Sequence, residues 1–305
     1  MNKLQVAICI PAYNEAQNIK KLLGELLRQK TKRIKINKIV VVASGCTDKT
    51  PQIVKKIAAQ NSIISLIYEK KRTGKAAAIN EFLKTTHEEI IVLESADTVP
   101  SQDTIEKLCV PFLEDSKIGM TGGAPIPVND PDTFLGYIIH AWWWFHRNIP
   151  RFGEIIAYRN ILPRISATTA VDEAYIQAKI IQKGYKVVHI DDAIVYNKGA
   201  ATLKDLIKQR RRVFNGHSRL FKEEKIKISN MTKSSVKLLL FSYQIKSVKH
   251  LFWLFGGILV EIYARILGTY DTYIVKINPY AWEVAYTTKD ISDVEITEGE
   301  EREEG

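Results

Sequence analysis

The first 113 residues alternate between short apolar segments rich in β-branched residues and longer segments with helical periodicity. The apolar segments occupy residues 4–10, 38–43, 63–68 and 89–93. The periodic segments that follow them occupy residues 15–28, 50–59, 75–84 and 101–113. Parallel strands need crossover connections and are buried on both faces, so they read as continuous apolar runs. The alternation therefore predicts an α/β fold with a mostly parallel sheet flanked by helices.

Polar side chains follow each apolar segment, where the predicted strand ends. They occupy residues 11–15 (PAYNE), 44–50 (SGCTDKT), 70–75 (KKRTGK) and 94–97 (ESAD). Ligands of such sheets bind beyond the carboxyl ends of the strands, so the polar residues that follow Ile10, Val42 and Leu93 are expected to border one crevice. Lys75 at a helix start suits a diphosphate, and Asp97 suits a hard divalent cation. Taken singly, each turn is equally explained as a helix cap or a solvated basic turn.

The four turns, in this order, resemble those of family 2 glycosyltransferases with the GT-A fold. That family shares a P-x-Y-N-E opening, a G-S/C-T-D turn, a G-K-x-x-A-x-N segment and a D-x-D strand end. The resemblance covers about residues 4–217. It continues through Gly122-Gly123, residues 153–159 (GEIIAYR), residues 172–176 (DEAYI), Gly184-Tyr185 and residues 209–213 (QRRRV). It implies an inverting transferase whose partners are a nucleotide-diphosphate sugar donor and a lipid-linked or glycan acceptor.

The resemblance also implies a role for each matching residue. Asp97 would bind the cofactor, Mg²⁺ or Mn²⁺. Glu173 would be the general base, because it stands eleven residues before Gly184, and Asp172 is the alternative. Gln209, Arg211 and Arg212, in a Q-x-x-R-W-like motif with Val213 in place of tryptophan, would lie over the acceptor and the diphosphate. The donor would be bound by Pro11, Ala12, Tyr13, Glu15, Ser44, Arg72, Lys75, Ser95, Ala96 and Asp97.

Three positions depart from the family pattern. Ser95 replaces the first acid of the D-x-D motif, so Asp97 would bind the metal alone or with help from Glu94. Ser44 stands where many relatives have an aspartate that reads the base. Asn197 falls near the histidine that often completes the metal site. These departures keep a second hypothesis open, a non-catalytic subunit that binds a nucleotide sugar or a lipid.

The last third of the chain suggests contact with a membrane. Residues 290–305 carry a net charge of −7, which leaves +17 on the rest of a chain whose total is +10. The positive charge of this larger part predicts anionic binding partners. Residues 251–267 (LFWLFGGILVEIYARIL) are apolar but contain Glu261 and Arg265. This favours an amphipathic or re-entrant helix, or a single span packed against a partner, over a clean span. Residues 142–145 (WWWF) fit an interfacial anchor and a buried core equally well.

We therefore expect three regions: a GT-A catalytic domain at 1–217, a helical membrane-associated region at 218–289, and an acidic disordered tail at 290–305. The three cysteines are widely spaced, which predicts a reducing compartment, and the N-terminus does not read as a signal peptide. The expected location is the cytoplasmic side of the cell membrane, on an anionic surface. We expect no nucleic-acid partner, because the basic residues are spread over many elements without a nucleic-acid-binding motif.

Overall fold

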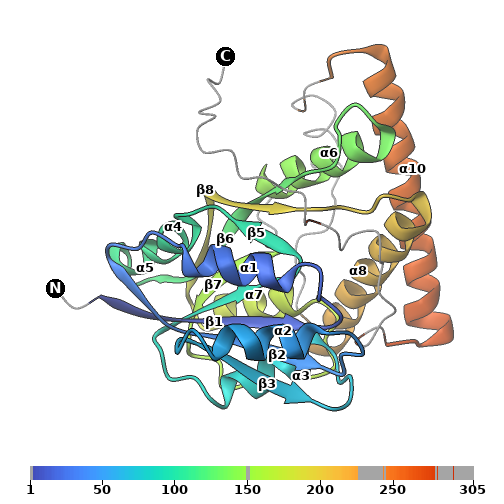
Figure 1. Cartoon of the computed structure of the whole chain (residues 1–305). Helices are drawn as coiled ribbons and strands as arrows, with labels where there is room; N and C mark the ends of the chain where they lie inside the picture. Colours follow the sequence, from blue (N-terminus) through green and yellow to red (C-terminus); the bar gives the residue numbers. More distant parts are fainter. Residues whose placement is uncertain are drawn as a thin grey trace.

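The computed structural model describes residues 3–148, 152–225, 243, 245–278, 280 and 291, and its centre is an eight-stranded sheet with helices on both faces (Figure 1). The strands are β1 (Leu4–Ala12), β2 (Ile34–Ser44), β3 (Ile64–Glu69), β4 (Ile90–Glu94), β5 (Thr98–Pro100), β6 (Ile118–Pro127), β7 (Ile155–Arg159) and β8 (Lys186–Asn197). The predicted α/β fold is confirmed. Apart from Ile291, the predicted acidic tail lies outside the described residues.

Helices account for the periodic segments of the sequence, with ends that differ from the predicted ones by a few residues. They are α1 (Ile19–Leu27), α2 (Thr50–Ala58), α3 (Lys75–Leu83), α4 (Thr104–Cys109), α5 (Pro111–Glu114), α6 (Phe134–Asn148), α7 (Asp172–Gln182), α8 (Leu203–Glu224) and α10 (Val248–Tyr270). A π-helical turn, Asp271–Val275, continues α10. Helix α8 runs past residue 217, where the sequence placed the end of the first region.

The sheet has the strand order β3-β2-β1-β4-β7-β6-β8-β5. The first four strands along the chain pair in parallel, as the strand–helix alternation predicts. Strand β7 then enters antiparallel between β4 and β6, while β6 and β8 pair in parallel. The carboxyl ends of β1, β2 and β4 consequently meet at one edge, and the chain entering β7 arrives beside the end of β4.

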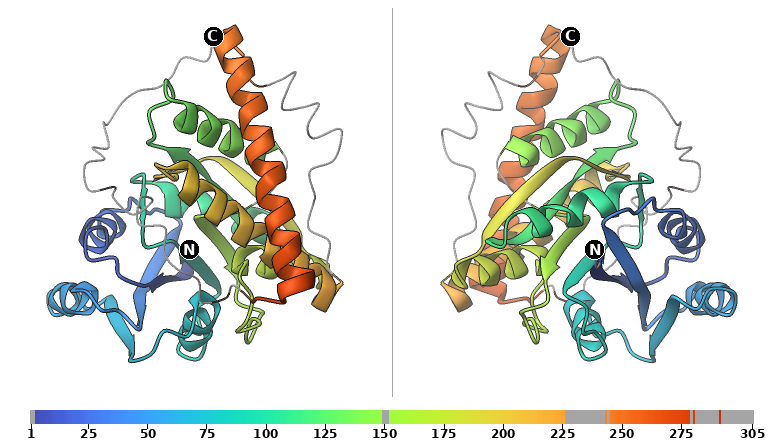
Figure 2. Two further views of the ribbon diagram at one scale, coloured as in Figure 1. Left: turned by 90° about the vertical axis from the view of Figure 1, so that its right-hand side faces the viewer. Right: turned by 90° about the vertical axis from the view of Figure 1, so that its left-hand side faces the viewer.

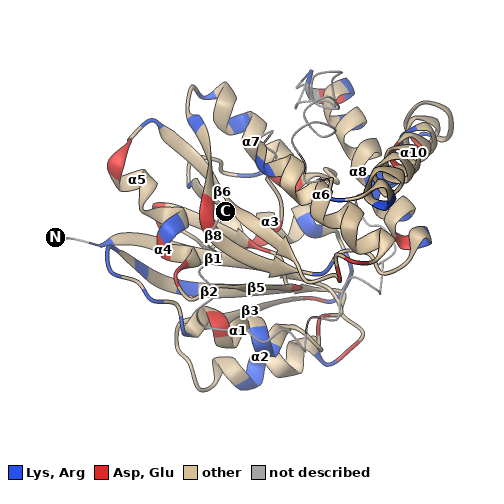
Figure 3. Cartoon of the chain, turned by 90° about the horizontal axis from the view of Figure 1, so that it is seen from above, with Lys and Arg blue, Asp and Glu red and all other residues tan. Residues whose placement is uncertain are grey.

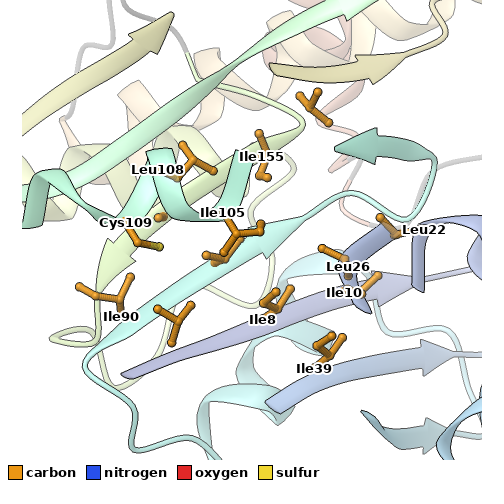
Figure 4. Close-up of a cluster of buried hydrophobic side chains, with 14 of the residues drawn as sticks. Ile8, Ile10, Leu22, Leu26, Ile39, Ile90, Ile105, Leu108, Cys109 and Ile155 are labelled. Carbon is orange, nitrogen blue, oxygen red and sulfur yellow. The ribbon is translucent and has the colours of Figure 1, made fainter. Parts of the chain in front are cut away.

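Side chains of β1 alternate between two buried clusters on opposite faces of the sheet. Ile8 and Ile10 pack with α1, α2 and α4 in one cluster (Figure 4). Ala7 and Cys9 pack on the other face with α3 and α7. Each strand at the centre is therefore buried on both sides, which fixes its register strongly, because a slip of one residue would exchange the two faces.

Helix α10 lies along the outer side of α8 and α6 (Figures 1 and 2). Gly257, Ala264 and Gly268 lie on its buried face, and their small size allows the helices to approach closely. Within the described part of the chain, Val248–Val275 is the one helical segment long and apolar enough to cross a membrane by length and composition, with a mean hydropathy of 1.6. One face of this segment is buried against α8 and α6, so the segment also packs as part of the domain.

Gly45, after β2, adopts the left-handed conformation at φ 63°. A Cβ there would lie 2.4 Å from the backbone nitrogen of Arg72, so the turn depends on glycine for both conformation and space. Gly184, after α7, has φ 84° with no atom within 4 Å of a Cβ, so it depends on glycine for conformation alone.

This contrast predicts two different costs. Gly184→Ala should destabilise the chain by about 1 kcal/mol through backbone strain. Gly45→Ala should cost about 2–4 kcal/mol, because the clash with Arg72 adds to the strain. Urea denaturation followed by tryptophan fluorescence measures both, and equal costs would contradict the close approach of the two turns.

Candidate active site

A cavity of about 410 Å³ opens at the carboxyl edge of the sheet. Ala12 at the end of β1, Ser44 at the end of β2 and Ser95 after β4 form part of one wall. The opposite wall comes from α6, α7 and α8 and includes Trp142 and Gln209. The polar turns after β1, β2 and β4 therefore meet in one place, as their positions at the strand ends predict, and the turn after β3 joins them through Arg72 and Lys75.

Most residues singled out from the sequence line this cavity. They are Pro11, Ala12, Tyr13, Glu15, Ser44, Arg72, Lys75, Ser95, Ala96, Asp97, Asp172, Glu173, Gln209 and Arg212. Arg211 does not line it and has to be removed from the predicted site. Its guanidinium pairs with Asp271 through two N–O contacts of 2.5 Å, because successive residues of a helix point in different directions.

The floor of the cavity holds a compact group of charges. Lys75 Nζ, in the first turn of α3, lies 2.5 Å from Glu173 Oε1 and 3.1 Å from Asp172 Oδ2 in the first turn of α7. Burial and the charge of Glu173 raise the pKa of Asp172 to about 6. Burial acts on the pKa of Glu173 in the same direction, but the charge and hydrogen bond of Lys75 bring it below its ordinary value. Glu173 is therefore ionised at neutral pH, and Asp172 ionises slightly below neutrality.

Arg212, on α8, faces this group from the opposite wall. Burial lowers the pKa of its guanidinium, and the charges of Asp172, Glu173 and two further carboxylates, Glu154 and Asp97, act against that shift. Arg212 and Lys75 thus present two cations to one space lined by carboxylates. Such a pair suits an anion with several oxygens, because guanidinium and ammonium groups both bind phosphate oxygens strongly.

The turns after β2 and β3 form a second part of the cavity wall. The Arg72 guanidinium stacks on the Tyr13 ring, with its central carbon 3.9 Å from the ring centroid. Ser44 Oγ accepts a hydrogen bond from the Thr73 backbone amide at 3.2 Å and lies 3.3 Å from the Lys71 carbonyl oxygen. Ser44 thereby joins the two turns as well as lining the cavity.

Oxygen atoms gather beside Asp97. Glu154 Oε1 accepts a hydrogen bond from Asn197 Nδ2 at 3.2 Å, and Asn197 Oδ1 is buried with no hydrogen-bond partner in the described part of the chain. Burial and the charge of Asp97 raise the pKa of Glu154 to about 7. Glu94 does not assist Asp97 as the sequence suggested: it is fully buried in β4, away from the cavity lining, and burial raises its pKa well above the ordinary value.

These oxygens fit a hard divalent cation that completes its ligand set with phosphate oxygens and water, as Mg²⁺ commonly does. Within the described residues, no three Asp, Glu, His or Cys side chains converge into a protein-only metal cage. The donor set therefore suits a cation shared with a bound diphosphate rather than a permanently held structural metal.

Two groups in the wall were not identified from the sequence as site residues. Glu154 lies in the GEIIAYR segment, which forms part of the family resemblance but carries no assigned role for its acid. Trp142 and Trp143 belong to an aromatic run that fitted an anchor and a core equally well. Trp142 is 9% exposed and lines the cavity, so this run is largely core and partly site wall.

Two family models match the chain. The model described as Glycosyl transferase family 2 matches residues 7–171, which is more than half of the chain. The model described as Glycosyl transferase family group 2 matches residues 159–286. Together they extend over the sheet, the cavity wall and α10.

Curated relatives share about a quarter of the aligned residues or slightly less. A poly-beta-1,6-N-acetyl-D-glucosamine synthase of Staphylococcus aureus (strain COL) is 23% identical over 235 residues, covering 72% of this chain and 56% of the relative. A probable glycosyltransferase, YdaM, of Bacillus subtilis (strain 168) is 22% identical over 233 residues, covering 70% and 55%. The chain therefore spans little more than half the length of these relatives.

The fold is that of the GT-A glycosyltransferases. A mannosyltransferase, PcManGT of Pyrobaculum calidifontis, solved in complex with GDP-Man and Mn²⁺, superimposes with a TM-score of 0.58 at 23% identity. The similarity covers 95% of this chain and 85% of that protein.

The opposite pKa shifts of the two α7 carboxylates predict opposite pH effects on stability. The folded state binds the proton of Asp172 more tightly than the unfolded state does, because the pKa of Asp172 is raised in the folded chain. The contribution of Asp172 to stability therefore falls as pH rises from about 4 to about 6. As pH rises through this window, the free energy of unfolding of Asp172→Asn should therefore increase by about 2–3 kcal/mol relative to that of the parent.

Glu173→Gln should shift in the opposite direction. The lowered pKa of Glu173 gives stability that is present above its ordinary value of 4.5 and is lost as pH falls. Relative to the parent, this variant should lose stability as pH rises through that range. Urea titrations of the three proteins in EDTA at several pH values measure both effects, and shifts of the same sign would contradict the assignment.

Proposed function

Because this chain belongs to glycosyltransferase family 2, we propose that it transfers a sugar, with inversion, from a nucleotide-diphosphate donor to a lipid-linked or glycan acceptor at the cytoplasmic side of the cell membrane. One observation carries the proposal: a single cavity holds two cations suited to a diphosphate, Lys75 and Arg212, beside a partly exposed, ionised carboxylate, Glu173. A donor and a base have to meet in this way for a direct displacement at a sugar carbon.

The donor is assigned to the side of the cavity formed by the sheet. The base and ribose lie against the turns after β1 and β2, where Tyr13 and Ser44 line the wall. The diphosphate lies between Lys75 and Arg212. Lys75 donates a hydrogen bond to Glu173 and forms an ion pair with Asp172, and an ammonium group has three N–H donors, so Lys75 can also donate to a phosphate oxygen.

A divalent cation, Mg²⁺ or Mn²⁺, belongs beside Asp97. When bound, it neutralises the charge that develops on the leaving diphosphate. Arg212 also neutralises charge on the leaving diphosphate, because its guanidinium faces the cavity from α8. Both cationic groups lower the barrier because they are in place before charge develops.

Glu173 is assigned as the base that deprotonates the acceptor hydroxyl. Its side chain is 17% exposed, against 3% for Asp172, and a base has to reach the hydroxyl before its pKa matters. Lys75 keeps Glu173 ionised and fixes its orientation. Asp172 then acts as the second partner of Lys75, through an ion pair of 3.1 Å.

The acceptor is assigned to the wall formed by α6 and α8. Trp142 and Trp143 line it, and aromatic rings present flat apolar faces suited to a sugar ring. They compensate for Val213, which replaces the tryptophan of the motif on α8.

The membrane is assigned to the outer face of α10. Large apolar side chains are exposed along it, including Phe252 at 70%, Phe255 at 59% and Ile266 at 61%. The opposite face holds Glu261, whose carboxylate lies 2.7 Å from both Arg210 Nε and Arg265 Nε. A helix with its charges turned toward the protein and its apolar residues turned outward suits the membrane interface.

Other partners and roles receive less support. Lys and Arg occur on several helices and loops, interspersed with Asp and Glu (Figure 3), so the charge pattern does not favour a nucleic-acid function. The substitutions at Ser95 and Asn197 favour, as a second candidate, a non-catalytic subunit that binds a nucleotide sugar or a lipid. That candidate predicts that Glu173→Gln leaves cellular function intact.

The first test is a thermal-shift screen of UDP- and GDP-sugars with and without Mn²⁺, followed by transfer assays with the sugar that stabilises the chain. Glu173→Gln should bind this donor with unchanged affinity and lose about 10²- to 10⁴-fold in turnover. A folded parent that binds no sugar nucleotide would refute the proposal, and unchanged turnover in Glu173→Gln would refute the assignment of the base.

The adjacent arginines of α8 provide a matched pair of variants. Arg212→Gln should weaken binding of the nucleoside diphosphate by about tenfold or more, because a charge-assisted contact is lost. Arg211→Gln should leave nucleotide binding unchanged and lower only stability, because Arg211 pairs with Asp271 outside the cavity. Isothermal titration with GDP and UDP compares the two, and equal losses would contradict the placement of the diphosphate.

Vesicle flotation tests the membrane face. The double variant Phe252→Ser/Ile266→Ser should bind vesicles of phosphatidylcholine and phosphatidylglycerol at least about tenfold more weakly than the parent, because two apolar side chains no longer enter the lipid. Ile181→Ser, at a residue that is 51% exposed on α7, is the control and should bind like the parent. Undiminished binding of the double variant would contradict the assignment.

A further inference from the structure

We propose that Glu154 supplies the metal-binding carboxylate that Ser95 lacks, and that Asn197 provides a third oxygen, so that the cation is held by Asp97, Glu154 and Asn197 together. The inference rests on the proposed donor site and deepens it. It assigns to this chain a metal subsite made only of oxygen ligands, with its second acid contributed by β7 instead of the turn after β4.

The sheet places Glu154 directly beside the turn that contains Asp97. Ile155, the first residue of β7, pairs with Glu94, the last residue of β4. The Ser95 amide then donates a hydrogen bond to the Glu154 carbonyl oxygen at 2.9 Å. The antiparallel entry of β7 thus brings a carboxylate from a distant part of the sequence to the position next to Ser95.

The backbone of Glu154 is held in an unfavourable conformation. Its φ is 64°, a region that residues with a Cβ seldom adopt, and Gly153 precedes it. A glycine at position 154 would fit this conformation without strain. Strain of this kind is maintained where the surrounding structure fixes it, and such residues are found mostly at functional sites.

Asn197, at the end of β8, is positioned to act with Glu154. It is 4% exposed, and its Nδ2 donates to Glu154 Oε1 at 3.2 Å. This bond fixes the orientation of the amide, so that Oδ1 remains buried without a hydrogen-bond partner among the residues that the structure describes. A buried oxygen without a partner is costly unless a ligand satisfies it, and a cation is such a ligand.

The chemistry of the three side chains selects the ligand. Two carboxylates and an amide oxygen are hard donors, which favour Mg²⁺ or Mn²⁺ over softer metals. All three residues line the same cavity as Lys75 and Arg212, so phosphate oxygens and water can complete the coordination. The histidine position of the family pattern is thus replaced here by an oxygen ligand.

Binding of Mn²⁺ tests the inference independently of turnover. Free Mn²⁺ is measured by electron paramagnetic resonance in the presence of GDP or UDP, for the parent, Glu154→Gln, Asn197→Ala and Asp97→Asn. Each of the three variants should weaken Mn²⁺ binding by tenfold or more. Glu114→Gln, an exposed acid paired with Arg33 far from the cavity, is the control and should match the parent.

Glu154→Gly separates metal binding from folding. It should unfold in EDTA at a temperature equal to or above that of the parent, because the backbone strain is removed, and yet bind Mn²⁺ as weakly as Glu154→Gln. If Glu154→Gln and Glu154→Gly bind Mn²⁺ with the parent's affinity while Asp97→Asn does not, this inference is overturned and the proposed function stands. If the parent itself binds neither nucleotide, with or without Mn²⁺, both fail.

Discussion

One partly buried ammonium group links the halves of the active site. Lys75 comes from the strand–helix half of the chain, and Glu173, to which it donates a hydrogen bond, lies 98 residues further along. Without this cation, Asp172 and Glu173 would repel each other in a site with little water, and the start of α7 would lose its contact with α3. Breaking a buried pair leaves an uncompensated charge, which is strongly destabilising. The same three residues therefore determine the shape of the cavity and its chemistry.

Helix α8 connects the cavity to the outer surface. Arg212 points into the cavity, while Arg210 and Arg211 reach Glu261 and Asp271 at α10 and its π-helical extension. Both outward contacts are bidentate, so α8 is fixed on the side away from the sheet. A membrane seated against α10 would therefore act on the helix that also carries Arg212, the arginine proposed to bind the diphosphate.

The sequence was sufficient to predict the α/β sheet and most of the cavity wall, because strand ends, glycines and caps are local features. Residues such as Ser44, Lys75 and Asp97 could be placed in this way. Glu154 could not, because its position depends on the antiparallel entry of β7, a non-local pairing that periodicity does not reveal. A related limit applies to Arg211: the motif identified the helix, but not the pairing with Asp271 that holds this arginine outside the cavity lining.

The central claim is that Glu173 promotes direct displacement at the sugar carbon of a nucleotide donor. The anomeric configuration of the first product measures this most directly, by ¹H NMR during transfer to an acceptor or to water. From an α-linked nucleotide sugar, the account predicts that the β-anomer forms first. Formation of the α-anomer as the first product would show retention and would contradict the account.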